Sequence, residues 1–141
     1  MWLTNGVLFN GDVAQTFLKY GTYVRFSMDT INPEKYKQIR GFDHCELVKK
    51  NIDEAIKIKY RNQYLCELSV KVGLAKELEV KDIQDIFDWA HGKRLFSVQV
   101  KNVWNELGNY YNTNLSRADI YTGVDNRGVR FGKKIGVKVG S

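Results

Sequence analysis

The sequence predicts an α/β protein built around a parallel sheet, and two observations lead to this fold class. Short segments rich in β-branched and aromatic residues alternate with longer segments whose apolar residues recur at helical spacing. The chain has 141 residues, of which 43% are hydrophobic and 27% charged, as in one ordinary globular domain. Alternating strands and helices are typical of right-handed crossover units, so we expect about four βα units in one domain.

Four short segments are predicted strands because they combine high β propensity with flanking turn residues. The first runs directly into the turn signal Thr4-Asn5-Gly6. In the third, polar residues alternate with apolar ones, so one face of this strand is expected to be polar, as in a strand that lines the lumen of an α/β barrel. The predicted strands are residues 1–3, 22–28, 64–73 and 95–100.

Helices are predicted between these strands from their capping residues and their apolar spacing. Asp12 is the expected cap of the first helix and Gly21 its end. Asn32 is the expected cap of the second helix, with Pro33 in its first turn. The predicted helices are residues 12–19, 32–40, 44–60 and 80–91, with a further helix at residues 102–111.

The last part of the chain differs from the rest in its charge and its glycine content. We expect residues 104–141 to extend the domain of residues 1–103 as a helix followed by a basic, glycine-rich hairpin. From Arg117 onward six Lys or Arg residues stand against two Asp residues, and the whole chain has a net charge of +6. Such a segment favours binding to a polyanion such as nucleic acid. The alternative, which we favour, is a solvated strand edge whose lysines discourage strand pairing.

The sequence signals of several classes of protein are absent from this chain. No apolar run reaches the roughly 18 to 20 residues that cross a bilayer, and no signal peptide is recognisable, so we expect a cytoplasmic protein without a membrane partner. No glycine-rich phosphate loop follows any predicted strand, which argues against nucleotide hydrolysis. Cys45 and Cys66 are too few and too far apart for a metal site and are expected to be buried free thiols.

Polar residues occur at the predicted C-terminal ends of the strands, where ligands bind in parallel α/β proteins. The Ser27 hydroxyl can donate to a carboxylate, and Asp29 can accept hydrogen bonds from sugar hydroxyls. Equally, both side chains can cap the turn that follows their strand. The polar and glycine residues near these ends are Thr4, Asn5, Ser27, Asp29, Gly73, Lys76 and Asn102.

Three motifs in the first part of the chain resemble those of radical S-adenosylmethionine enzymes. They are LTNG at residues 3–6, YVRFSMD at residues 23–29 and EKYKQIRG at residues 34–41. Members of that family commonly carry a TNG strand end, a VRxSxD strand and an IRG stretch in this order. The similarity continues through the helix at residues 46–55 and, more weakly, through the last two predicted strands, so that it covers residues 1–103.

The resemblance implies a partial parallel (β/α) barrel that binds S-adenosylmethionine. Ser27 and Asp29 match positions that often contact the ribose or the carboxylate of this cofactor. The main chain at Val98 to Val100 matches a segment that commonly meets adenine. The cofactor-binding residues that the resemblance implies are Thr4, Asn5, Ser27, Asp29, Val98 and Val100.

One departure from the family limits the expected activity. The CxxxCxxC loop that binds a [4Fe-4S] cluster is absent from the sequence, and Cys45 and Cys66 cannot replace it. We therefore expect a truncated or split part of a radical S-adenosylmethionine enzyme, catalytic only with an N-terminal half that supplies the cluster. The catalytic residues are not assigned.

Two other hypotheses remain open at this stage. One is a small basic nucleic-acid-binding protein that uses residues 117–138, and the other is a degenerate barrel retained as a protein-interaction unit. An incomplete barrel also has open strand edges, so self-association of the chain is expected.

Overall fold

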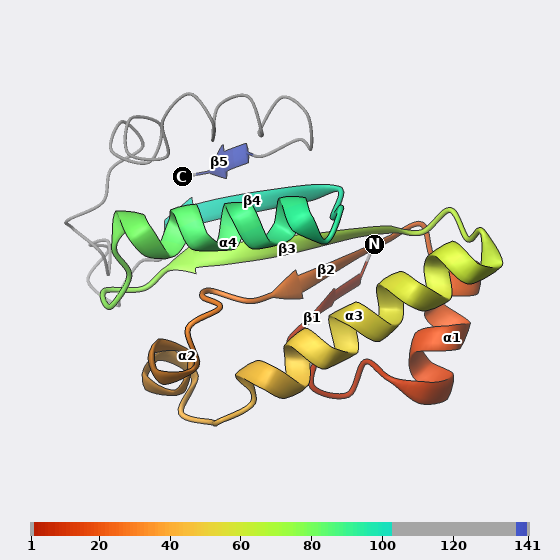
Figure 1. Ribbon diagram of the computed structural model, residues 1–141, viewed down its shortest axis with the longest axis horizontal. Helices are drawn as coiled ribbons and strands as arrows, with labels where there is room; N and C mark the ends of the chain where they lie inside the picture. Colours follow the sequence, from red (N-terminus) through yellow and green to blue (C-terminus); the bar gives the residue numbers. More distant parts are fainter. Residues whose placement is uncertain (1, 103–137, 141) are drawn as a thin grey trace.

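The structure is a computed structural model that describes residues 2–102 and 138–140, which form one five-stranded sheet and four helices (Figure 1). The elements follow the order β1 (Trp2–Thr4), α1 (Gly11–Tyr20), β2 (Tyr23–Ser27), α2 (Pro33–Arg40), α3 (Cys45–Asn62), β3 (Glu67–Leu74), α4 (Val80–Gly92), β4 (Ser97–Asn102) and β5 (Lys138–Gly140).

All five strands are parallel, and their order in the sheet, β1-β2-β3-β4-β5, is their order along the chain. A parallel neighbour can be reached only by a crossover, and from β1 to β4 the helices between consecutive strands provide it. Figure 1 shows α3 and α4 lying across the same face of the sheet. Consecutive parallel strands with helices on one face form the partial barrel segment that the sequence predicts.

Two strands begin later than predicted because a turn first closes the preceding helix. Gln63 follows α3 in the left-handed region, with φ 56°, and the Tyr64 N–H donates to the Lys59 carbonyl at 3.0 Å. The strand therefore starts at residue 67 instead of 64. Arg94, with φ 58°, has the same role after α4, so β4 starts at residue 97 instead of 95.

Most of the predicted C-terminal extension lies outside the described residues. This holds for the expected helix at residues 102–111, except that residue 102 ends β4, and for the expected hairpins at residues 120–139. The described end of that segment, β5, pairs in parallel with β4.

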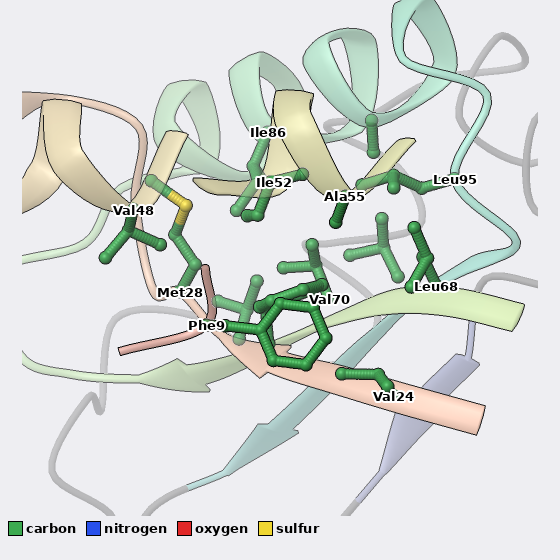
Figure 2. Packing of buried hydrophobic residues seen from close by; sticks show 14 of the residues in the cluster. Phe9, Val24, Met28, Val48, Ile52, Ala55, Leu68, Val70, Ile86 and Leu95 are labelled. Carbon is green, nitrogen blue, oxygen red and sulfur yellow. The ribbon is translucent and has the colours of Figure 1, made fainter. Parts of the chain in front are cut away.

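The core lies between the sheet and its helices (Figure 2). In β2 the side chains of Val24 and Phe26 are fully buried, whereas the alternate residues are partly exposed. From α3, Val48 and Ile52 reach the same core one turn apart and are fully buried. Burial of each such side chain contributes about 1.5 to 3 kcal/mol to folding. Among the described helices, none is long and apolar enough to cross a membrane.

Candidate functional site

The face of the sheet opposite the helices carries polar side chains in rows that cross the strands. Because side chains alternate along a strand, the residues between the buried ones of β2, β3 and β4 point to this face. The register sets Arg25 beside Ser69 and Ser97, and Ser27 beside Lys71 and Gln99. We call this surface, formed by residues Tyr23, Arg25, Ser27, Glu67, Ser69, Lys71, Ser97, Gln99 and Lys101, the polar face.

The polar face is predominantly basic at its C-terminal half. Lys71 and Lys101 project from β3 and β4, and neither forms an ion pair with another described residue. Glu67 lies at the opposite end of β3. The C-terminal half of the polar face is therefore suited to a negatively charged or strongly polar ligand.

Ser27 is the last residue of β2 and is partly exposed on this face. No other described residue forms a hydrogen bond with its hydroxyl. Its neighbours across the strands are Lys71 on β3 and, one strand further, Gln99, whose side-chain oxygen is buried without a hydrogen-bond partner in the described structure. The alternative that Ser27 caps its own turn is therefore not what the structure shows.

Asp29 has a different environment from Ser27. Its Oδ1 accepts a hydrogen bond from the Gly73 N–H at 2.7 Å, and its Oδ2 lies 3.1 Å from Nη2 of Arg40. The Asp29 side chain is only 14% exposed. Asp29 thus joins the ends of β2 and β3 to the end of α2, and it does not cap the turn after its own strand.

Thr4 and Asn5 form the turn that ends β1. The Thr4 hydroxyl accepts a hydrogen bond from the Gly6 N–H at 3.1 Å, and the Asn5 side-chain oxygen accepts one from the Val7 N–H at 3.0 Å. Gly6 has φ 82°, a conformation that L side chains rarely adopt, which explains the glycine in this motif. Both polar residues line a groove of about 540 Å³ whose other walls are mostly apolar and include Phe42 and His44.

Asn51 fixes this turn from α3, and the sequence did not single it out as a site residue. Its side-chain amide is buried and donates to the carbonyls of Gly6 at 2.8 Å and Val7 at 3.1 Å. The available signal was an asparagine on the apolar face of a helix, next to Ile52. A buried amide must find partners, and here the partners are the carbonyls of the strand-end turn.

The side chains of Val98 and Val100 are fully buried and point toward the helices. Their main chain lies in the sheet between β3 and β5. A ligand contact at these two positions would therefore use the main chain, as the resemblance implies. Of the other strand-end residues, Gly73 is held by Asp29, Lys76 is exposed in the loop after β3, and residue 102 ends β4.

A hydroxyl cluster occupies the N-terminal half of the polar face. Ser97 donates to Ser69 at 2.9 Å, and the Tyr23 hydroxyl accepts from Arg25 at 3.3 Å. Burial acts to raise the pKa of the Tyr23 phenol, but hydrogen bonds with Ser69, Arg25 and Ser97 outweigh it, so this pKa is lowered. This network joins three strands at the end away from Ser27.

Both cysteines lie in the described part of the chain and are removed from solvent. Cys45 begins α3 and Cys66 precedes β3, and both are buried free thiols. Burial raises the pKa of each thiol, which opposes the thiolate form that binds iron. In the described part of the chain, no three His, Cys, Asp or Glu side chains are grouped so that they could hold a metal ion.

Comparison with known proteins places the chain in a family. It is 33% identical to the "Probable GTP 3',8-cyclase" of Methanocaldococcus jannaschii over 111 residues, which are 77% of this chain and 35% of that protein. It is 36% identical to the protein of the same name from Methanococcus vannielii over 88 residues, which are 61% of this chain and 27% of that protein. No family model matches the chain.

Solved structures show the same fold. The crystal structure of Streptococcus suis SuiB matches 99% of this chain with a TM-score of 0.70 and 8% identity. The structure of SuiB bound to S-adenosylmethionine matches it with a TM-score of 0.72 and 9% identity. In each case the match covers 32% of the SuiB chain.

The fold and the polar strand ends define a partial α/β barrel of the kind that binds ligands at the carboxyl ends of its strands. The chain belongs to the radical S-adenosylmethionine family and matches a part of such proteins, as its three motifs predicted. Its matches span 35% and 27% of the length of the two relatives.

Proposed function

We propose that this chain provides the S-adenosylmethionine-binding strands of a radical S-adenosylmethionine enzyme. The observation that carries the proposal is the hydroxyl of Ser27, which stands at the C-terminal end of β2 on the polar face without a hydrogen bond to another described residue. A preformed site keeps such a group free for a ligand. The chain's family membership and the S-adenosylmethionine bound to SuiB support the choice of ligand.

The cofactor would lie across the ends of β1, β2 and β4. Ser27 would donate its hydroxyl to the carboxylate or ribose, and the main chain near Val98 and Val100 would meet the adenine. Thr4 and Asn5 would approach the cofactor from the neighbouring strand end, since their side-chain oxygens accept only one hydrogen bond each. These roles rest on the positions of the residues and on the resemblance.

The residues present do not fit a [4Fe-4S] cluster, because two cysteines are too few to ligate it, both are buried, and burial raises the pKa of each thiol. We propose that another polypeptide segment supplies the cluster ligands, so this sequence is a fragment or split part of the active enzyme. The sequence by itself then binds and orients the cofactor but does not cleave it.

The substrate we propose carries phosphate groups. The relatives' name refers to GTP, and the C-terminal half of the polar face presents Lys71 and Lys101, with Arg25 on the adjacent row. Cationic side chains without carboxylate partners favour a polyanionic ligand. The alternative function in nucleic-acid binding is not favoured by the relatives, and nearly all of the segment 117–138 that it needs lies outside the described residues.

Calorimetric titration of the full chain with S-adenosylmethionine tests the proposal. We expect saturable binding that Ser27→Ala weakens about tenfold, since loss of a hydrogen bond to a charged group costs about 1.5 kcal/mol or more. Thr16→Ala, which removes an exposed hydroxyl from α1, is the matched control and should bind as the unmodified chain does. Absence of binding by the unmodified chain, or equal affinities of all three proteins, would contradict the proposal.

A further inference from the structure

Asp29 and Arg40 form a partly buried ion pair near the strand ends, in which the Asp29 carboxylate faces protein groups. Both carboxylate oxygens of Asp29 already have protein partners, Gly73 and Arg40, and the side chain is 14% exposed. Little of this carboxylate is therefore accessible to a ligand.

The Gly73 N–H needs this carboxylate because β2 ends before β3 does. The pairing of β2 with β3 stops at Ser27 and Lys71, and the last main-chain hydrogen bond between them runs from the Met28 N–H to the Lys71 carbonyl at 3.0 Å. β3 continues to residue 74, so the Gly73 N–H has no strand carbonyl to meet on the β2 side. The Oδ1 of Asp29 takes the place of that carbonyl and extends the ladder by one bond.

Arg40 orients the carboxylate for this bond. It is the last residue of α2, its side chain is 29% exposed, and its Nε is buried and has no hydrogen-bond partner in the described structure. The carboxylate of Asp29 therefore balances the positive charge of Arg40 at this partly buried position. The pair also fixes one end of α2, whose other end is held by Lys35 at 2.6 Å from Asp82 of α4.

We infer that Asp29 and Arg40 are positioning residues that hold the end of β3 in register beside Ser27, so that Asp29 is not itself a ligand contact. The inference rests on the proposed function for the identity of the ligand. Ser27 then contacts the ligand, and the ion pair of Asp29 and Arg40 holds the strand ends in place.

Two measurements on the full chain test the inference. The first is the hydrogen-exchange rate of the Gly73 amide, measured by NMR and divided by the exchange rate of the Val70 amide in the same strand. This ratio corrects for changes in global stability. Arg40→Gln should raise this ratio at least tenfold although Arg40 does not touch Gly73, and Asp29→Ala should raise it at least as much. Arg40→Lys, which keeps the charge, should restore part of the protection.

The second measurement is the affinity for S-adenosylmethionine. Arg40→Gln should weaken binding about fivefold or more, and Arg40→Lys should recover part of the loss. Lys35→Gln is the matched control, because it breaks the part-buried ion pair at the other end of α2 without touching Asp29. It should leave the Gly73 ratio and the affinity within twofold of the unmodified chain.

The outcomes separate the inference from the proposed function. An unchanged Gly73 ratio in Arg40→Gln would overturn the inference, as would a raised ratio with unchanged affinity. Asp29→Asn binding more weakly with an unchanged Gly73 ratio would show that Asp29 is a ligand contact. If the unmodified chain does not bind S-adenosylmethionine, the proposed function fails, and the role of the pair at the strand ends is then decided by the exchange ratio alone.

Discussion

Replacing Asn51 with leucine is expected to destabilise the chain more than any other single hydrogen-bonding change on α3. Asn51 is 4% exposed, and its side-chain amide donates two hydrogen bonds, to the carbonyls of Gly6 and Val7. Leucine has the same branching and the same number of side-chain heavy atoms and suits a helix, but its methyl groups are bulkier than the amide, so the lost donors act together with local overpacking. Each bond contributes about 1 kcal/mol, and the carbonyls left without a partner add a desolvation cost, so we expect a loss of about 2 to 3 kcal/mol.

Urea unfolding of Asn51→Leu and the unmodified chain, followed by circular dichroism, measures this difference in the free energy of unfolding. Asn62→Leu is the matched control, because the Asn62 amide makes one exposed hydrogen bond, to the Ile58 carbonyl at 2.9 Å in the last turn of α3. The control should change stability by less than about 0.5 kcal/mol. An Asn51→Leu protein as stable as the control would refute the view that this amide holds the strand-end turn.

Two further predictions concern the turn and the thiols. Gly6→Ala should lower the free energy of unfolding by about 1 to 3 kcal/mol in the same assay, because the residue has φ 82° and the added Cβ would lie 2.9 Å from Cγ1 of Val48. Gly41→Ala is the control and should cost less, because Gly41 has a similar φ of 79° but open space around the added Cβ. Burial raises the pKa of the Cys45 and Cys66 thiols in the folded chain. The stability that these neutral thiols contribute is therefore complete below the unfolded thiol pKa of about 8.5, and it is lost as the pH rises through the higher pKa values of the folded chain. Urea midpoints that do not fall between pH 8 and 10, or rapid alkylation of both thiols in the folded chain at pH 8, would contradict this assignment.

Much of the fold was predictable because local patterns and tertiary packing agree in this chain. The buried side of β2, the cap at Asn32 and the apolar face of α3 each follow from a periodicity or a turn residue. The predicted cap at Asp12 was wrong, because α1 begins at Gly11 and Asn10 occupies its cap position. The polar side of β3 was also predicted from its alternation and is confirmed as part of the polar face. Strand starts were less predictable, since Gln63 and Arg94 adopt left-handed conformations that their residue types do not announce.

The site was predictable only in part. The sequence correctly placed Thr4, Asn5, Ser27 and Asp29 near the ends of neighbouring strands, because parallel strands end at one edge of the sheet. It treated Ser27 and Asp29 alike, whereas the structure gives them different partners. Whether either side chain contacts S-adenosylmethionine stays a prediction for the titrations above.

The sequence by itself determined the order of strands and helices, the polar strand ends and the family of the chain, since these depend on residues close together along the chain. Only the tertiary structure decided the partners of Asp29 and Asn51, because Gly73 is 44 residues from Asp29 and Gly6 is 45 residues from Asn51. Such contacts depend on the register of β2 with β3 and on how α3 packs beside the first turn. Local propensity carries no information about either.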